Sequence, residues 1–397
     1  MQKIYLTYSR LLSSVDNSYH RYLYDKINWD NRLIAIKGPK GVGKTTLVLQ
    51  HIKDTFKDVT KALYVSMDNI WFKSHTVSEL VEYHYSHGGT HIFIDEVHKY
   101  NDWAQEIKNV YDSYPDFHIV VTGSSLLRLE DAMEHDLSRR CRMYDLQGLS
   151  FREFVRLETG KEFNVYNIEQ VVKSHFEIAT EITSKVKILP LFEKYVRNGY
   201  YPFYREEGDG YWDRLQFVVR TIVENDIPSV DKIEFESLYK AERFLSILSE
   251  MVPFTLNIAS LTSTLGLSRN SLLKIFDLLD RAKLIRLMYT CKVGMKQLAK
   301  PEKILFDNSN LLFALTSNVD SGTVRECFFC NQVGQLYNTV IPKTGDCLVN
   351  DKYLFEIGGK KKSFKQVKEI PDSYVVVDDI EVGMGNRIPL WLFGFMY

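Results

Sequence analysis

Short apolar runs recur through the first 150 residues, separated by longer stretches in which apolar and polar residues mix. The runs cover residues 32–37, 62–68, 91–96, 118–124 and 141–146. Each is nearly continuous rather than alternating, which is typical of strands in a parallel sheet with both faces covered. The mixed stretches predict crossover helices, so we expect an α/β domain over about residues 30–150, preceded by a helical, peripheral segment.

The pattern changes twice after residue 150. Residues 151–231 look helical and predict a lid or linker. Residues 232–306 predict a winged helix-turn-helix, in which Gly266 makes the tight turn, Ser268 caps the second helix and residues 284–289 and 303–306 form the wing. The last part, 307–397, returns to strands at 346–349, 352–357, 373–377 and 388–392 and predicts a mixed α/β domain.

The first apolar run is followed by a phosphate-loop pattern, G-x-x-x-x-G-K-[ST]. It reads Gly38-Pro39-Lys40-Gly41-Val42-Gly43-Lys44-Thr45 and leads into a helix-forming stretch that starts at Thr46. Glycines allow backbone N–H groups to close around phosphate oxygens, a lysine supplies a point charge, and a threonine hydroxyl can hold Mg²⁺. The expected ligand is therefore a nucleoside triphosphate.

Two acids, Asp95 and Glu96, end the third run. The carboxyl ends of parallel strands meet at one edge of the sheet, so Asp95 can reach Mg²⁺ while Glu96 polarises an attacking water. An acid pair in a solvated loop is the alternative, and the preceding phosphate loop favours the catalytic interpretation.

The fourth run ends in hydroxyls, and Arg139 and Arg140 precede the fifth. Ser124 can sense the γ-phosphate, or Ser124 or Ser125 can cap the next helix. Arg140, with Arg139 as second choice, can neutralise transition-state charge at a neighbouring subunit, which would make the active protein an oligomer. Both arginines can equally be surface residues without a role.

Composition narrows the class of protein. The 397 residues are long enough for two to three domains, and a formal net charge of -1 does not by itself indicate a nucleic-acid binder. The odd number of cysteines predicts reduced thiols rather than a disulfide framework. We find neither a signal-peptide pattern nor an apolar run of membrane-spanning length, so we expect a cytoplasmic protein with no membrane contact.

These motifs together resemble a known group, the AAA-family P-loop ATPases of bacteria and archaea that carry a C-terminal region of uncharacterised function. The resemblance rests on residues 38–46, Ile94-Asp95-Glu96-Val97-His98, Thr122-Gly123-Ser124-Ser125, Leu137-Ser138-Arg139-Arg140, residues 149–154, Asn198-Gly199-Tyr200-Tyr201-Pro202 and residues 354–361. Lys40 stands where the family usually has arginine, and Arg139 where a glycine usually precedes the arginine. The resemblance implies an AAA+ sheet of the ASCE type in residues 1–150, ATP and Mg²⁺ as cofactors, and self-association.

The same resemblance implies a C-terminal fold similar to PD-(D/E)-x-K nucleases, which need two acids and a lysine two residues after the second acid. Asp346 and Glu356 fit, and Glu326 is a possible third acid. Position 358 is glycine, so the nearest candidate is Lys360, expected on the same face of a continuing strand. Loss of nuclease activity is the more economical interpretation.

Three outputs remain open. A DNA-associated motor or switch is favoured by the lysine-rich residues 360–368 and by four residues on the second helix of the winged motif: Arg269, Asn270, Lys274 and Arg281. An ATP-gated switch that binds proteins is the second alternative, and an active metal nuclease is the third. Cys327 and Cys330 lack a second ligand pair for zinc, so we expect them to pack in a helix core.

Overall fold

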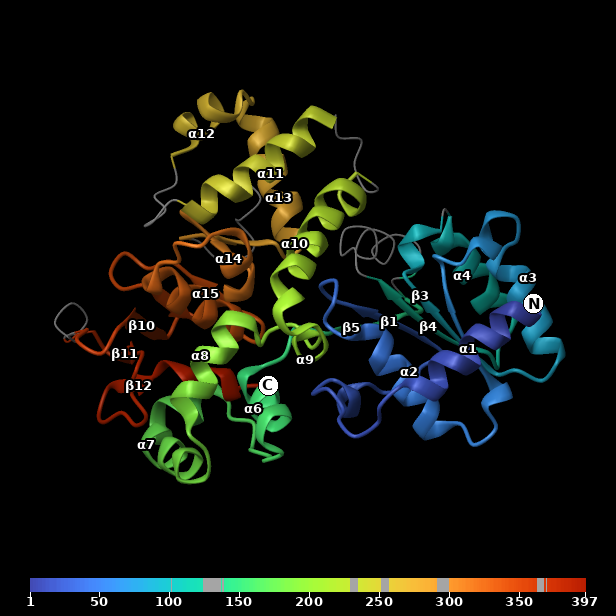
Figure 1. The fold of residues 1–397 in the computed structure, drawn as a ribbon, viewed down its shortest axis with the longest axis horizontal. Helices are drawn as coiled ribbons and strands as arrows, with labels where there is room; N and C mark the ends of the chain where they lie inside the picture. The colour runs from blue at the N-terminus through green and yellow to red at the C-terminus, as the bar shows by residue number, and fades with distance from the viewer. Residues whose placement is uncertain are drawn as a thin grey trace. The chain divides into compact units, whose positions relative to one another are not determined.

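The structure is a computed structural model that describes residues 1–100, 102–123, 137, 139–228, 235–250, 257–290, 300–362, 368 and 370–397. The chain divides into two compact units, Met1–Gly148 and Leu149–Tyr397 (Figure 1). The segments predicted as lid, winged helix and nuclease-like domain all belong to the second unit. No helix in the described ranges is both long enough and apolar enough to cross a bilayer.

The first unit is built on a parallel sheet, which has five strands among the described residues, in the order β2-β3-β4-β1-β5. The strands are β1 (Leu33–Lys37), β2 (Ala62–Ser66), β3 (His91–Asp95), β4 (His118–Gly123) and β5 (Arg142–Asp145). The sheet confirms the α/β class predicted from the continuous apolar runs. Because β4 lies between β1 and β3, its carboxyl end lies between the phosphate loop and Asp95.

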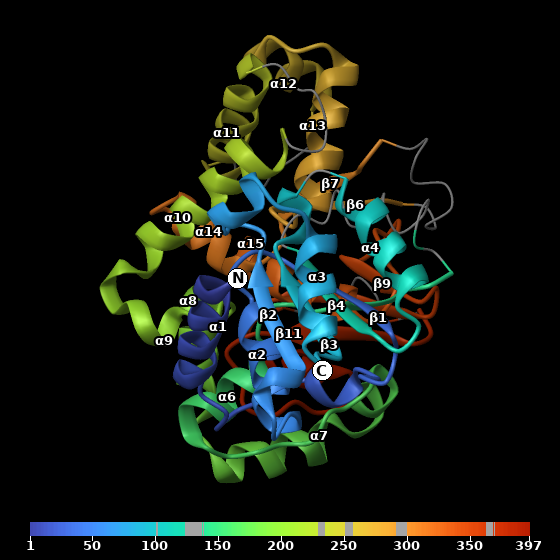
Figure 2. The ribbon, with the colours of Figure 1, turned by 90° about the vertical axis from the view of Figure 1, so that its right-hand side faces the viewer.

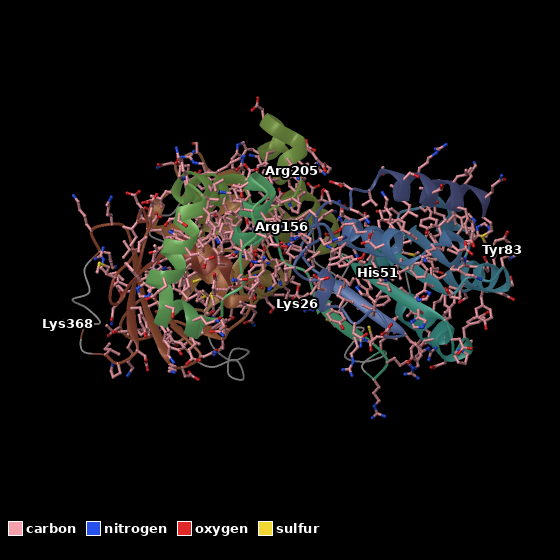
Figure 3. The ribbon with its side chains drawn as sticks, turned by 90° about the horizontal axis from the view of Figure 1, so that it is seen from below. Lys26, His51, Tyr83, Arg156, Arg205 and Lys368 are labelled. Carbon is pink, nitrogen blue, oxygen red and sulfur yellow. The ribbon has the colours of Figure 1, made fainter. Side chains whose placement is uncertain are left out.

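Helices connect these strands. They are α1 (Gln2–Ser14), α2 (Lys44–Thr55), α3 (Val77–Ser86) and α4 (Trp103–Ser113), with 3-10 turns at Tyr24–Lys26, Val59–Lys61, Ile70–Lys73 and Val97–Lys99. The N-terminal helix α1 packs against α2 and β2 (Figure 2). The inner face of α2 is buried and includes His51 (Figure 3), whose ring stacks on that of Trp29.

The second unit opens with helices. They are α6 (Phe151–Thr159), α7 (Ile168–Lys185), α8 (Ile188–Asn198), α9 (Tyr204–Glu207) and α10 (Tyr211–Thr221), with a 3-10 turn at Gly208–Gly210 and a π-helical turn at Ile222–Asp226. The expected helical character of this segment is therefore confirmed.

Three helices and a hairpin follow: α11 (Phe235–Glu250), α12 (Ile258–Leu265), α13 (Arg269–Arg281), and the antiparallel strands β6 (Ile285–Met288) and β7 (Lys303–Phe306). Gly266 has a left-handed φ of 61°, as the expected turn requires. The Ser268 hydroxyl accepts a 3.1 Å hydrogen bond from the Ser271 N–H and caps α13.

The remaining elements form a second sheet, mixed in direction and five-stranded over the residues that the structure describes, in the order β12-β11-β10-β9-β8. They are α14 (Ser309–Leu315), α15 (Ser321–Gly334), β8 (Thr339–Val340), β9 (Cys347–Val349), β10 (Tyr353–Gly358), β11 (Ser373–Val377) and β12 (Arg387–Pro389). The strand expected over residues 388–392 is shorter than predicted, because Leu390–Phe395 turns into a 3-10 helix. The apolar run at Leu390–Phe395 therefore reflects burial of this 3-10 helix and not a longer strand.

The predicted lid packs tightly against the end of the chain within this unit. The Arg152 guanidinium donates a 3.0 Å hydrogen bond to the Tyr397 carbonyl.

The fully buried Asn310 donates to the carbonyls of Tyr195 and Val196 and accepts from Tyr200 N and the Tyr211 hydroxyl, at 2.7–3.1 Å. The NH₂ group and the oxygen of the Asn310 side chain therefore each make two hydrogen bonds, and these bonds connect α8, α10 and α14.

Candidate functional site

The phosphate loop, residues 38–45, leaves β1 and enters α2 at Lys44. Gly41 and Gly43 have φ of 86° and 97°, which side-chain-bearing residues rarely adopt. A Cβ on Gly38 would lie 2.1 Å from the Leu146 carbonyl oxygen, so no side chain fits there. The loop therefore presents bare backbone at the N-terminus of a helix, the arrangement that binds phosphate.

A buried arginine supports the loop from behind. Arg21 donates to the Val42 carbonyl at 2.5 Å and to the carbonyls of Gln147 and Gly148 at 2.8 and 2.9 Å. It is 6% exposed. This guanidinium joins the loop to the segment that follows β5, a role that the sequence did not suggest.

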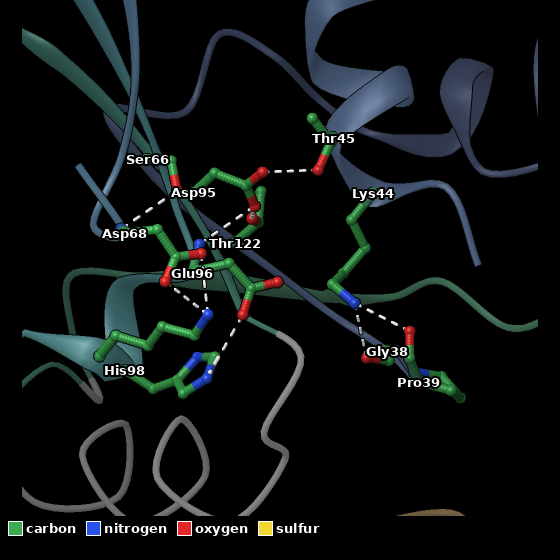
Figure 4. Close-up of polar contacts among 11 residues, drawn as sticks. Gly38, Pro39, Lys44, Thr45, Ser66, Asp68, Asp95, Glu96, His98 and Thr122 are labelled. Atoms are coloured by element: carbon green, nitrogen blue, oxygen red, sulfur yellow. Dashed lines mark hydrogen bonds and ion pairs between the residues drawn. The ribbon is translucent and has the colours of Figure 1, made fainter. Parts of the chain in front are cut away.

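The Lys44 ammonium is buried and bends back over the loop (Figure 4). It donates to the carbonyls of Gly38 and Pro39 at 2.8 and 2.9 Å. Phosphate oxygens can replace these two carbonyls as acceptors, because the same ammonium has three donors and free rotation.

Asp95, at the end of β3, accepts hydrogen bonds from hydroxyl groups on three neighbouring elements, of which Figure 4 shows those of Thr45 and Thr122. Its Oδ2 accepts from Thr45 at 2.5 Å and from the Tyr64 hydroxyl at 2.8 Å, and its Oδ1 accepts from Thr122. Burial and then the Asp95 charge raise the pKa of Tyr64 far above its usual value, so this hydroxyl stays a donor.

The donor set at Asp95 fits Mg²⁺. Magnesium in nucleotide sites is held by one or two carboxylate or hydroxyl oxygens together with phosphates and water. Asp95 and Thr45 supply such oxygens side by side. Among the described residues, no group of three or more histidine, cysteine or acidic side chains could hold a metal ion on its own.

Glu96 follows Asp95 in a left-handed conformation, with φ of 53°. Its Oε2 lies 3.4 Å from Nε2 of His98, a residue that is 2% exposed. A left-handed φ is uncommon for a residue with a side chain, and the His98 imidazole lies beside the Glu96 carboxylate.

Three residues at this site were not chosen from the sequence: Tyr64, Thr122 and His98. The register between β3 and β4 explains why Thr122 lies beside Asp95. Ile94 is aligned with Val121, so the next residues along, Asp95 and Thr122, are neighbours on adjacent parallel strands. The predicted sensor, Ser124, lies outside the described residues and stays a prediction.

Comparisons with known proteins agree with this geometry. A family model described as an AAA domain matches residues 30–155, and one described as a domain of unknown function (DUF8612) matches residues 189–321. Residues 30–155 are therefore similar to an AAA domain, and they contain the phosphate loop and Asp95.

Relatives of the whole chain carry no stated activity. The uncharacterized protein MJ1637 of Methanocaldococcus jannaschii is 25% identical over 398 aligned positions, covering 90% of this chain and 84% of its own length. The uncharacterized protein MJ1544 of the same organism is 25% identical over 176 residues, 43% of this chain and 36% of its own.

Solved structures are more distant. AMPPCP-bound DnaA from Aquifex aeolicus is 14% identical, with a TM-score of 0.24, over 74% of this chain and 89% of its own. PCH-2 of C. elegans is 15% identical, with a TM-score of 0.25, over 69% of this chain and 67% of its own. At these TM-scores the likeness supports no conclusion about this chain.

The arginines of the AAA domain lie just before β5. Arg140 donates from Nε and Nη2 to the two carboxylate oxygens of Asp112, both at 3.0 Å, and its side chain is 31% exposed. Arg139 is exposed. The predicted finger is thus held within its own chain by an ion pair to α4.

In the second unit the predicted acids come together but the predicted lysine does not. The charges of Glu326 on α15, Asp346 before β9 and Glu356 on β10 all act on the ammonium of Lys362. The expectation for Lys360 was wrong, because β10 ends at Gly358 and Lys360 lies in an exposed turn, 4.0 Å from Asp379. Strand periodicity therefore stops before it reaches this lysine.

The cysteines are reduced where the structure describes them. Cys327, Cys330 and Cys347 are buried free thiols, and Cys141 is a half-buried one. Phe328 and Phe329 between the first two are also buried, so the predicted core packing is confirmed. Cys291 lies outside the described residues.

Proposed function

We propose that this chain binds and hydrolyses ATP in a Mg²⁺-dependent reaction. The observation that carries the proposal is the meeting of Thr45 and Asp95 at 2.5 Å beside the phosphate loop. A metal ligand pair, a buried lysine and helix N-terminal amides at one edge of a parallel sheet make up a triphosphate site.

Each residue has a separate role in the proposed reaction. The loop amides and Lys44 bind the phosphates, while Thr45 and Asp95 hold the metal ion. Bound Mg²⁺ neutralises charge that develops on the phosphate oxygens. Glu96 accepts a proton from the attacking water, and the neighbouring His98 imidazole sets the orientation of its carboxylate.

Self-association completes the proposed site through Arg140. An arginine from a second subunit stabilises the equatorial charge of the transferred phosphoryl group. The ion pair of Arg140 with Asp112 is partly exposed, and such pairs contribute about 0–1 kcal/mol. Its release for a contact across a subunit boundary therefore costs little.

The output that we propose is association with DNA through the winged helix-turn-helix formed by α12, α13 and the hairpin β6–β7. On α13, Arg269, Asn270 and Lys274 are exposed, while Leu272, Ile275 and Phe276 are buried. The amphipathic split leaves cationic and amide groups on the outer face, the residue types that contact phosphates and base edges.

Turnover of ATP, measured with and without duplex DNA, tests both parts. We expect Mg²⁺-dependent hydrolysis by the wild type, loss of nucleotide binding in Lys44→Ala, and retained binding with turnover lowered about a hundredfold or more in Glu96→Gln. Tight ATP binding by Lys44→Ala would contradict the site. For the output, Arg269→Ala/Lys274→Ala should abolish any effect of DNA on turnover and leave the basal rate unchanged.

A further inference from the structure

Three carboxylates from separate elements gather at one end of β10 in the second unit. Glu356 lies on β10 and is 3% exposed, Glu326 lies on α15, and Asp346 directly precedes β9. Three acids from a helix, a strand and the residue before a strand resemble a divalent cation site. As the side chains stand, with Lys362 beside them, no group of three or more acids, histidines or cysteines among the described residues is arranged to hold a metal ion.

Lys362 of the same chain pairs with one of these carboxylates and is close enough to the other two to be affected by their charge. Nζ of Lys362 lies 2.6 Å from Oε1 of Glu356. Burial lowers the pKa of Lys362, but the hydrogen bond to Glu356 and the charges of Asp346, Glu356 and Glu326 outweigh it and raise the pKa overall. The ammonium is therefore a permanent positive charge among the three carboxylates.

The backbone is shaped for this lysine. A Cβ on Gly358 would lie 2.6–2.8 Å from Cδ, Cγ and Cβ of Lys362, so the lysine stem occupies the space that any side chain at position 358 would need. Arg387 donates to the carbonyls of Lys362 and Lys360 at 2.9 and 3.0 Å and fixes the returning chain. The glycine and the lysine four residues later are thus complementary.

The other two carboxylates also have partners within the chain. Glu326 forms an ion pair with Lys303 of β7. Asp346 accepts a 2.6 Å hydrogen bond from the Ile357 N–H. A divalent ion would have to displace the Lys362 ammonium and compete with Lys303, and a half-buried cation already paired with a buried acid opposes a second cation.

We propose that the ammonium of Lys362 is the resident cation of this acidic site and occupies it in place of a divalent metal ion. The second unit then has no metal-dependent hydrolytic chemistry at this position, and loss of Lys362 creates a metal site. This inference does not depend on the ATPase proposal, since all the residues involved lie in the second unit.

Lys362→Met tests the proposal, because it keeps an unbranched stem of similar length and removes the charge. Without nucleotide, we expect 1 mM MnCl₂ to leave the Tm of the wild type unchanged. This concentration is on the order of a hundred times the dissociation constant expected for the acidic site without the Lys362 ammonium. In Lys362→Met, we expect a lower Tm without metal and a rise of about 5 °C with MnCl₂. Lys361→Met, at an exposed neighbouring lysine, is the matched control and should behave as the wild type does.

If Lys362→Met does not fold, the wild type, Lys362→Arg and Glu356→Gln still test the proposal. Lys362→Arg keeps the cation and should show no response to MnCl₂. Glu356→Gln should bind as many Mn²⁺ ions as the wild type, because any ion held at Asp95 is present in both. Counting bound Mn²⁺ by electron paramagnetic resonance should give one more ion for Lys362→Met than for the wild type, and none extra for Lys362→Met/Glu356→Gln. A wild-type Mn²⁺ ion that disappears in Glu356→Gln overturns the proposal, as does a folded Lys362→Met that binds no extra ion.

Discussion

The phenol of Tyr64 donates a 2.8 Å hydrogen bond to Oδ2 of Asp95, the oxygen that also accepts from Thr45. This contact holds the carboxylate between β2 and the phosphate loop. The oxygen proposed to bind Mg²⁺ is therefore positioned by a side chain that has no chemistry of its own in the reaction.

Removing that hydroxyl should lower turnover without abolishing it. Tyr64→Phe keeps the ring and loses one hydrogen bond to a charged group, which corresponds to about a tenfold lower kcat. ATP affinity should change less than kcat, because Lys44 and the loop amides remain. Steady-state kinetics measures kcat and the apparent ATP affinity. Tyr100→Phe is the control, because the hydroxyl of Tyr100 contacts Glu106 and not Asp95. An unchanged kcat in Tyr64→Phe would show that Asp95 needs no such support.

Subunit mixing should reveal whether Arg140 acts across a boundary. Arg140→Ala lacks the proposed finger and Lys44→Ala lacks nucleotide binding, so each alone should be at least about a hundredfold slower than the wild type. Mixed together, the intact phosphate loop of the first can meet the intact arginine of the second, and activity should return. If mixtures stay inactive, or if Arg139→Ala is as damaging as Arg140→Ala, then the assignment of Arg140 is wrong.

Acid should destabilise the first unit through the buried His51 and the half-buried His91. Burial, and then the charge of His91, lower the pKa of His51 to about 4, and burial, with the charges of His118 and His84, lowers the pKa of His91 to about 4. Both are neutral when folded, while the unfolded chain protonates them near pH 6.5. Their contribution to stability is complete above pH 6.5 and is lost as the pH falls towards 4.

Urea unfolding at several pH values measures this effect. Between pH 7 and pH 5 we expect the unfolding free energy to fall by about 2–4 kcal/mol. His51→Phe can keep the stacking on Trp29 and should remove about half of the pH dependence. A flat profile over this range would mean that the folded protein accepts these protons freely.

A methyl group added at Gly394 should strain the core of the second unit. A Cβ there would lie 2.4 Å from Cβ of Phe151 and 3.0 Å from Cζ of Phe328. Overpacking of this kind costs about 1–3 kcal/mol, so Gly394→Ala should lower the unfolding free energy of the second unit by that amount. Gly210→Ala, where the nearest atom is 3.6 Å away, should change it by less than about 0.5 kcal/mol. Equal effects of the two substitutions would contradict the packing around Phe151.

Much of the nucleotide site was predictable because its signals are local. The loop from Gly38 to Thr45 and the acids that end β3 are defined by residue type and by the strand before them. Thr122 needed the register between β3 and β4, which a single strand cannot supply. The role of Arg21 could be recognised only from the folded structure, because its three acceptor carbonyls come from segments far apart in the sequence.

The C-terminal acids illustrate the limit of periodicity. Alternation along a strand predicts which side chains share a face only while the strand lasts, and β10 ends at Gly358. The turn after it brings Lys362 back over the strand, so spacing alone selected Lys360 wrongly. The four-part division of the chain stays a prediction, while α6 packs directly on the residues that end the chain.

Arg21 also limits how far the first unit can be shortened from its N-terminus. The stretch that matches the AAA domain model begins at residue 30, downstream of this arginine. A truncated protein starting there would keep every strand of the first sheet, yet the carbonyls of Val42, Gln147 and Gly148 would lose their shared donor. We therefore expect that a fragment able to bind ATP must start before Arg21, upstream of the stretch that matches the domain model.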